Sequence, residues 1–176
     1  KDFRLQLAAG PVTYIAPDRE LPLVNLTLLV RTGEYVEPAG KEGVTDLTGY
    51  LLSRGGTKSR TAEELEERLA FLAAGLNSAV HDTQASVSLN LLSKDLDEGL
   101  AILREVLTEP RFQEDKFKLR VTQLMQSMKR RNDDSSDIES RERNYLVHGE
   151  QFFANHEITE ASLQGVTIDD VRAFHR

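Results

Sequence analysis

Four histidines are the side chains of this chain best suited to bind a metal or to transfer protons: His81, His148, His156 and His175. Zinc sites often take two histidines three or four residues apart, because that spacing puts both on one face of a helix. No histidine here has a second histidine at such a spacing. We therefore interpret all four as surface or turn residues.

Two other kinds of site are weakly supported. The run Asp133-Asp134-Ser135-Ser136-Asp137 is rich in oxygen ligands but lacks the glycine and the terminal bidentate glutamate of a calcium loop. Acidic residues at a helix N-cap explain this run better. The sequence holds no G-x-S-x-G elbow for a nucleophilic serine, and it has no cysteine. The missing cysteine excludes disulfides, thiolate metal sites and cysteine catalysis.

The most informative segment is Gly43-Val44-Thr45-Asp46-Leu47-Thr48-Gly49-Tyr50-Leu51-Leu52, followed by Arg54-Gly55-Gly56-Thr57. A helix is predicted from about residue 44 to 53, because Gly55-Gly56 suits a helix end. At 100° per residue, Asp46, Gly49 and Tyr50 share an arc about 100° wide. Apolar residues occupy the opposite arc. We therefore expect the polar arc to be presented away from the core.

This segment resembles the inverted zinc motif of the insulinase/pitrilysin family of zinc peptidases, which includes the mitochondrial processing peptidases. That motif is H-x-x-E-H on a helix after a glycine, and a Gly-Thr turn follows it. The resemblance continues along nearly the whole chain in an ordered set of segments: residues 23–34, 76–79, 107–112 and 128–134. The sequence is identified as a member of this family on the whole set.

The motif positions depart from the family pattern. Asp46 stands at the first histidine, Gly49 at the glutamate and Tyr50 at the second histidine. The family's third ligand is a glutamate on a long downstream helix, where residues 122–128 hold no acid and Gln126 is the best match. Two imidazoles and a carboxylate base are what the zinc chemistry needs. The resemblance therefore implies a non-catalytic member, with no cofactor of its own and with zinc only in a partner subunit.

A peptide-binding strand is also implied by the resemblance. Asn77, Ser78 and Ala79 match the family's substrate-binding strand, beside which a peptide adds to the sheet edge. Such pairing draws affinity from backbone hydrogen bonds, and small residues let another backbone approach. The alternative is that these residues belong to an ordinary hairpin strand.

The elements that position these residues follow from local patterns. Strands are predicted at residues 3–7, 12–15 and 23–31 and in a hairpin at 76–80 and 84–92. After 44–53, a helix begins at the capping pattern Thr61-Ala62-Glu63-Glu64 and ends at Gly75. The later helices include a stripe of leucines, a long helix with five apolar residues inward, a helix at 137–147, and a last one after Thr167; residues 151–165 are mostly irregular. The stripe is Leu96, Leu100, Leu103 and Leu107; the five are Phe117, Val121, Leu124, Met125 and Met128.

This order predicts an α+β fold with a largely antiparallel sheet packed against helices. We assign residues 1–176 to a single domain, the N-terminal peptidase-like domain of a longer chain, and expect its last strand to be missing. The 22 basic and 29 acidic residues give a net charge of −7, which argues against nucleic acid as a partner. No apolar run approaches the ~20 residues of a membrane span. A bacterial periplasm and a bacterial cytoplasm both fit.

The resemblance implies a function in proteolysis. Family members enclose a chamber with paired, similar domains, so we expect this domain to pair with a zinc-bearing homologous peptidase subunit and to help enclose and orient peptide substrate. One alternative is an active zinc metallopeptidase with an unrecognised site, for which His81 and His148 are candidates. Another is a structural scaffold similar to the core proteins of respiratory complexes.

Overall fold

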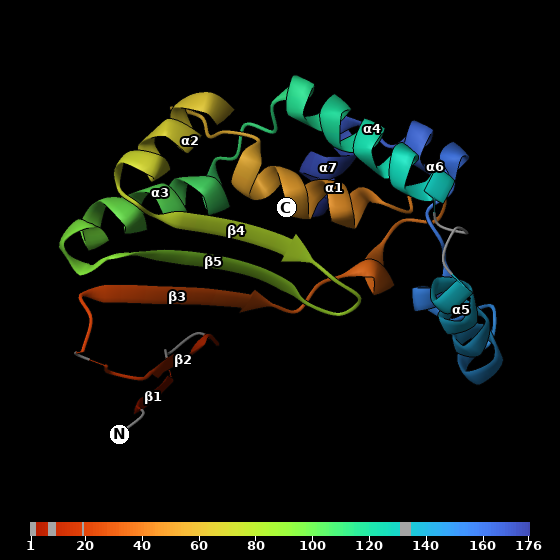
Figure 1. Cartoon of the computed structure of the whole chain (residues 1–176), viewed down its shortest axis with the longest axis horizontal. Helices are drawn as coiled ribbons and strands as arrows, with labels where there is room; N and C mark the ends of the chain where they lie inside the picture. Colours follow the sequence, from red (N-terminus) through yellow and green to blue (C-terminus); the bar gives the residue numbers. More distant parts are fainter. Residues whose placement is uncertain (1–2, 7–9, 19, 131–134) are drawn as a thin grey trace.

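The computed structural model describes residues 3–6, 10–18, 20–130 and 135–176 (Figure 1). The fold is α+β, as predicted. Three short 3-10 turns lie at Glu34–Val36, Ser93–Asp95 and Phe153–Asn155. The remaining elements, in chain order, are β1 Phe3–Gln6, β2 Val12–Ile15, β3 Leu23–Val30, α1 Val44–Arg54, α2 Ala62–Phe71, β4 Gly75–Val80, β5 Ala85–Leu92, α3 Leu96–Thr108, α4 Glu114–Arg130, α5 Ser135–His148, α6 Glu160–Gly165 and α7 Ile168–His175.

The main sheet has three antiparallel strands in the order β3-β5-β4, so β3 and β4 are its two edges. Leu26 pairs with Leu89 on one side of β5, and Leu76 pairs with Leu89 on the other. The β1–β2 hairpin forms a separate two-stranded sheet. Figure 1 shows this hairpin beyond β3, on the side of the sheet opposite to α1 and α2.

The core lies between the sheet and the helices. Alternate residues of β5 face the same side, so Val87, Leu89 and Leu91 are all buried. From α1, Leu47 and Leu51 are fully buried against them in one cluster. This cluster positions α1, which carries the motif residues, beside β4. No helix in the described part of the chain is both long enough and apolar enough to cross a membrane.

The buried face of α3 differs from the leucine stripe that the sequence predicts. Leu100 is 43% exposed, while Gly99, Ile102 and Val106 are buried. The cause is the close approach of α3 to β5 at Gly99, where a Cβ atom would lie 2.3 Å from Leu91 Cδ1. The helix turns its glycine, not its leucine, toward the strand, and periodicity counts only apolar side chains.

Three helix ends also test the predicted caps. Thr61 and Thr167 both form capping boxes, as their sequences predict. Residues 151–165 are not mostly irregular, because Thr159 and Ser162 make a reciprocal cap that begins α6. A serine replaces the glutamate by which such boxes are recognised. Helix α2 ends at Phe71 rather than at Gly75, which starts β4; the left-handed residue in between is Ala73, with φ of 48°.

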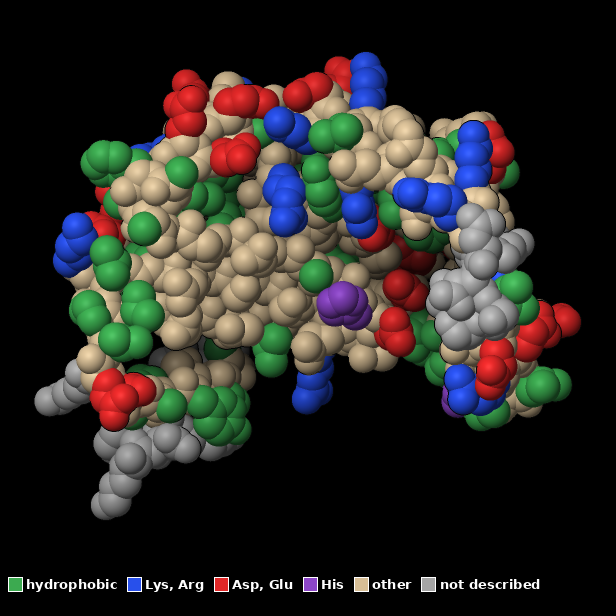
Figure 2. All heavy atoms as spheres, viewed as in Figure 1, with side chains coloured by type: hydrophobic (Ala, Val, Ile, Leu, Met, Phe, Trp, Pro, Cys, Tyr) green, Lys and Arg blue, Asp and Glu red, His purple; other side chains and the backbone are tan. Residues whose placement is uncertain are grey.

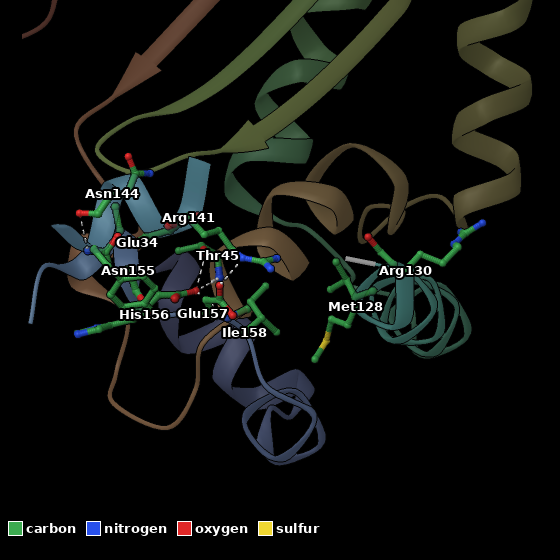
Figure 3. A pocket seen from close by; sticks show the side chains of 16 residues that line it. Glu34, Thr45, Met128, Arg130, Arg141, Asn144, Asn155, His156, Glu157 and Ile158 are labelled. Atoms are coloured by element: carbon green, nitrogen blue, oxygen red, sulfur yellow. Dashed lines mark hydrogen bonds and ion pairs between the residues drawn. The ribbon is translucent and has the colours of Figure 1, made fainter. Parts of the chain in front are cut away.

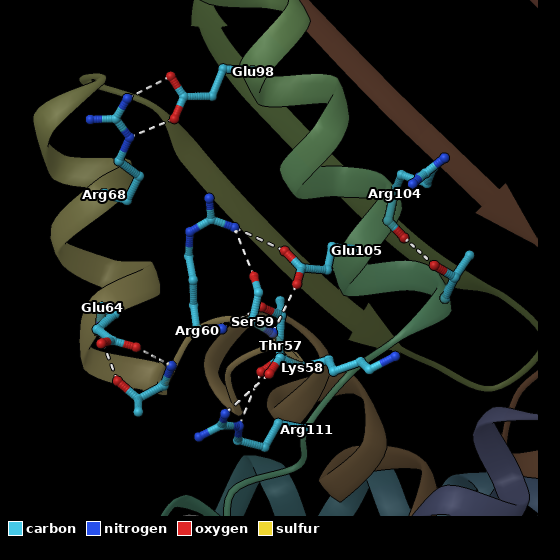
Figure 4. A network of polar contacts seen from close by, with 12 residues as sticks. Thr57, Lys58, Ser59, Arg60, Glu64, Arg68, Glu98, Arg104, Glu105 and Arg111 are labelled. Atoms are coloured by element: carbon cyan, nitrogen blue, oxygen red, sulfur yellow. Dashed lines mark hydrogen bonds and ion pairs between the residues drawn. The ribbon is translucent and has the colours of Figure 1, made fainter.

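Ion pairs fix the loop after α1 and hold α2 against α3 (Figure 4). Arg60 Nη1 lies 2.9 Å from Glu105 Oε2, and Arg68 donates to both carboxylate oxygens of Glu98. Thr57 is fully buried, and its carbonyl oxygen accepts from Arg111 Nε at 3.0 Å. The end of α1 is therefore anchored to the rest of the domain.

Candidate functional site

The N-terminus of α1 is capped from outside the helix. Gly43 precedes the helix with φ of 105°, in the left-handed region. The Glu37 carboxylate accepts hydrogen bonds from the backbone N–H groups of Gly43 at 3.0 Å and Thr45 at 2.9 Å. A negative charge at this end also suits the helix dipole. These bonds fix the first turn, from which the motif positions follow.

Asp46, at the first motif position, is bound by an arginine. Arg120 of α4 donates from Nε to Asp46 Oδ1 and from Nη2 to Asp46 Oδ2, both at 2.7 Å. The two side chains are 32% and 27% exposed, so solvent screens the pair only in part. The hydrogen bond to Asp46 raises the pKa of Arg120. Both carboxylate oxygens thus serve to join α1 to α4.

Tyr50, at the third motif position, lies next to two cations. The guanidinium carbon of Arg54 is 5.1 Å from the ring centroid, and that of Arg120 is 4.9 Å away. Both distances allow a cation–π attraction. The tyrosine therefore extends the contact between α1 and α4 that Asp46 begins.

Gly49, at the second motif position, packs directly on β4. A Cβ atom there would lie 2.7 Å from the backbone nitrogen of Val80 and 3.2 Å from Ala79. The Gly49 carbonyl oxygen accepts from Ser78 Oγ at 2.5 Å. The expectation that this arc is presented away from the core is wrong: β4 covers Gly49, and α4 covers Asp46 and Tyr50.

The remaining predicted ligands are not brought together. Gln126 is exposed on α4, and the α4 residue that reaches α1 is Arg120. Among the described residues, no group of three or more His, Asp or Glu side chains could hold a metal ion. His81, His148 and His156 are exposed, and His175 contacts the Leu107 carbonyl oxygen at 3.0 Å. The acidic residues Asp133 and Asp134, interpreted above as a helix cap, lie outside the described residues.

Strand β4 carries the predicted peptide-binding residues on an open sheet edge. Asn77 is exposed, and Ser78 and Ala79 are half-buried. The hydrogen bond from His81 N to Gln84 O, 2.9 Å long, closes the hairpin and sets the phase of the ladder. Because bonded pairs alternate in antiparallel strands, the backbone groups of Leu76, Ser78 and Val80 point away from β5. Helix α1 lies against Ala79 and Val80, and its Gly49 carbonyl oxygen accepts from the Ser78 side chain, so the part of this edge farthest from α1 is the start of the strand.

Two cavities of about 520 Å³ each flank α1. The first, beside the N-terminus of α1, lies between Thr45, α4 and residues 154–158 (Figure 3). Its wall includes Glu34, whose pKa is raised by burial and by the nearby charges of Asp82 and Glu37. The second opens beside the start of β4 and is lined by Tyr50 and Arg54 among others. No sequence motif predicts either cavity, because each is assembled from several separate segments.

Comparisons of the sequence with known proteins point to one family of peptidases and their homologues. Residues 15–148 match the sequence profile of the family described as "Insulinase (Peptidase family M16)". An uncharacterized zinc protease of Rickettsia bellii is 22% identical over 121 residues, which are 67% of this chain and 29% of that protein. The non-peptidase homolog YmxG of Helicobacter pylori is 24% identical over 171 residues, which are 94% of this chain and 38% of that protein.

A crystal structure shows the same fold. The peptidase M16 inactive domain from Pseudomonas fluorescens superposes with a TM-score of 0.90 at 21% identity, over 99% of this chain and 43% of that one. The chain thus spans less than half the length of each of these three proteins. The family profile covers most of the sequence, including α1 and the sheet. The chain belongs to the insulinase family, peptidase family M16.

Proposed function

We propose that this chain is a non-catalytic M16 domain that holds an extended peptide along β4 and pairs with a zinc-bearing homologous subunit. The observation that carries the proposal is the use of the motif face as a packing surface. Asp46 is bound at both oxygens by Arg120, and Gly49 is pressed against the backbone of β4. A zinc peptidase needs ligands and a base at these positions, where this chain has a salt bridge and a glycine.

Two similar proteins support the same proposal. The Helicobacter pylori relative is called a non-peptidase homolog, and the Pseudomonas fluorescens structure an inactive domain. Both are longer than this chain, and the family is built of paired, similar domains. We therefore propose that a homologous subunit carries the zinc, and that this domain closes the chamber beside it.

Peptide binding rests on the open edge of β4. The outward backbone groups of Leu76 and Ser78 offer the hydrogen bonds that a further strand would take. The side chains of Asn77, Ser78 and Ala79 are small, so a second backbone can approach closely. Because these bonds involve only the main chain, binding along this edge tolerates many peptide sequences.

The experiment uses one substitution at this edge. Ser78→Pro removes an N–H that points away from β5, so it blocks an added strand without breaking the β5 ladder. Ser78→Ala is the matched control, since it also loses the bond to Gly49 but keeps the N–H. We expect the proline variant to lose peptide binding, measured by fluorescence anisotropy, and the alanine variant to keep it. Equal binding by both variants would exclude this edge.

Pairing and catalysis are tested with the purified protein and an M16 homologue that has an intact H-x-x-E-H motif. We expect the protein alone to hold no stoichiometric zinc and to cleave no peptide, and the mixture to form a complex that cleaves. One zinc per chain, lost on substitution of His81 or His148, would refute the non-catalytic assignment. Co-purification with subunits of a membrane complex would instead favour the scaffold alternative.

A further inference from the structure

The cavity beside the start of β4 is the strongest unassigned feature. Its volume is about 520 Å³, and the first residues of β4 form one wall. The other walls come from α1, α2 and α4, and most of their lining side chains are apolar or small. The lining includes Tyr50, Arg54, Glu66, Leu69, Lys116 and Leu119. A strand added to β4 would therefore pass the mouth of this cavity.

Arg54 is the cationic group of this cavity that no carboxylate neutralises. Its guanidinium lies over the Tyr50 ring, and Nη1 is 3.4 Å from Ser53 Oγ. Within the part of the chain that the structure describes, no Asp or Glu lies within ion-pair distance of it. Arg54 is exposed, so its guanidinium can reach an incoming anion, and the Tyr50 ring favours the position in which it lies over the ring.

The two other cations around the cavity are already paired. Lys116 Nζ lies 2.8 Å from Glu63 Oε1, and Arg120 is bound by Asp46. The hydrogen bond that Lys116 donates to Glu63 chiefly raises the pKa of Lys116, and the charge of Glu66 adds to this. Glu66 is the one acid in the lining, and within the described residues it forms no ion pair. Figure 2 shows Lys and Arg side chains over α1 and α4, between the strands and the acidic side chains along the top of the view.

We propose that this cavity receives an acidic side chain of the peptide bound along β4, with its carboxylate on Arg54. This proposal rests on the proposed function, because β4 must first bind the peptide backbone. A guanidinium binds a carboxylate through charge-assisted hydrogen bonds, often two at once. Leu69 and Leu119 form apolar walls that suit the methylene groups of a glutamate. Strand pairing supplies affinity, and the cavity supplies a preference at one position of the peptide.

The experiment measures the binding of an extended, threonine-rich host peptide with one varied residue. Peptides carrying glutamate, glutamine, leucine or lysine at that position are titrated against the protein by fluorescence anisotropy. We expect the glutamate peptide to bind about tenfold more tightly than the glutamine peptide. Arg54→Gln should abolish this difference. The matched control is Arg104→Gln, which removes an exposed arginine of α3 that lines neither cavity.

A charge reversal makes the test independent of a general loss of binding. Arg54→Glu should weaken binding of the glutamate peptide and strengthen binding of the lysine peptide, so that the order of preference inverts. Peptides that bind wild type with equal affinity, or a preference for leucine, would overturn the acidic subsite and leave strand pairing intact. Binding unaffected by Ser78→Pro would overturn the proposed function itself.

Discussion

The two edges of the main sheet are chemically different. Along β4, most exposed or half-buried positions carry small residues. The end of the strand contacts α1 at Val80, and the turn after β3 bonds to His81 just beyond it. Along β3, Leu29 and Val30 are 58% and 44% exposed. The ladder phase points the backbone groups of Leu29 and of alternate residues before it away from β5. The β4 edge, where we propose that a peptide binds, carries small side chains, and the β3 edge carries large apolar ones.

The β1–β2 hairpin extends the apolar character of the second edge. Tyr14 is 72% exposed on β2, and Leu21 is 64% exposed just before β3. An open edge with large apolar side chains favours association with another chain. The comparison therefore shows that the two edges present the same kind of outward backbone groups beside side chains of different size and polarity.

The largest loss of stability is expected from a substitution that disrupts the contact between α1 and β4. Gly49→Ala places a Cβ atom 2.7 Å from the Val80 backbone nitrogen, so helix or strand must shift. In an open helix, alanine is more stable than glycine by about 1 kcal/mol. Here we expect a net loss of about 1–3 kcal/mol in the free energy of unfolding, measured by urea denaturation.

Gly165→Ala is the control for this substitution. A Cβ atom at Gly165 meets nothing closer than 3.8 Å, at the Gly40 carbonyl oxygen. We expect its unfolding free energy to stay within about 0.5 kcal/mol of wild type. Equal effects of the two substitutions would show that α1 does not press on β4 at Gly49.

The second largest loss of stability is expected when the Asp46–Arg120 ion pair between α1 and α4 is broken. Asp46→Asn leaves Arg120 without a carboxylate in a half-buried position. We expect a loss of about 1–2 kcal/mol, allowing for partial solvent screening. A double-mutant cycle with Arg120→Gln measures the coupling energy, and additive single effects would argue against the pair. The cycle also shows whether the lost metal site has been replaced by a stabilising contact.

These contacts show what the sequence could and could not predict. Strands and helix ends depend on neighbouring residues, so strand patterns, the caps at Thr61 and Thr167, and the Gly55-Gly56 helix end located the strands, α2, α7 and α1. The Asp46–Arg120 pair joins residues 74 apart, and no local pattern relates them. The burial of Gly49 depends on β4, which the helical arc of α1 does not describe. On α3 the sequence placed Leu100 on the buried face, where the structure has Gly99, while Leu103 and Leu107 do pack against the core.

A smaller effect on stability is expected at Glu34, in the turn that bonds to the residue after β4. Glu34 N donates to the His81 carbonyl oxygen at 3.3 Å, next to the hairpin tip. Burial, together with the charges of Asp82 and Glu37, raises the pKa of Glu34. A raised carboxyl pKa gives stability that is present below the unfolded pKa of about 4.3 and is lost as pH rises through the folded value.

Glu34→Gln should therefore stabilise the protein at pH 7 but not at pH 4. We expect a gain well below about 1 kcal/mol at neutral pH, because Glu34 is only partly buried and solvent screens its charge. Urea denaturation of wild type and variant at both pH values measures it. A gain of the same size at pH 4 would mean that the ionisation of Glu34 is not its cause.

The smallest effect on stability is expected from a substitution on the exposed edge of β3. Leu29→Lys replaces an exposed apolar side chain on the open edge, so the free energy of unfolding should change by less than about 0.5 kcal/mol. Self-association, measured by sedimentation, should fall because a charge on an edge strand opposes pairing. Phe71→Lys is the matched control, since Phe71 is 77% exposed at the end of α2 and belongs to neither edge strand. If both substitutions reduce association equally, general surface hydrophobicity drives it; if only Leu29→Lys does, the β3 edge itself forms the contact.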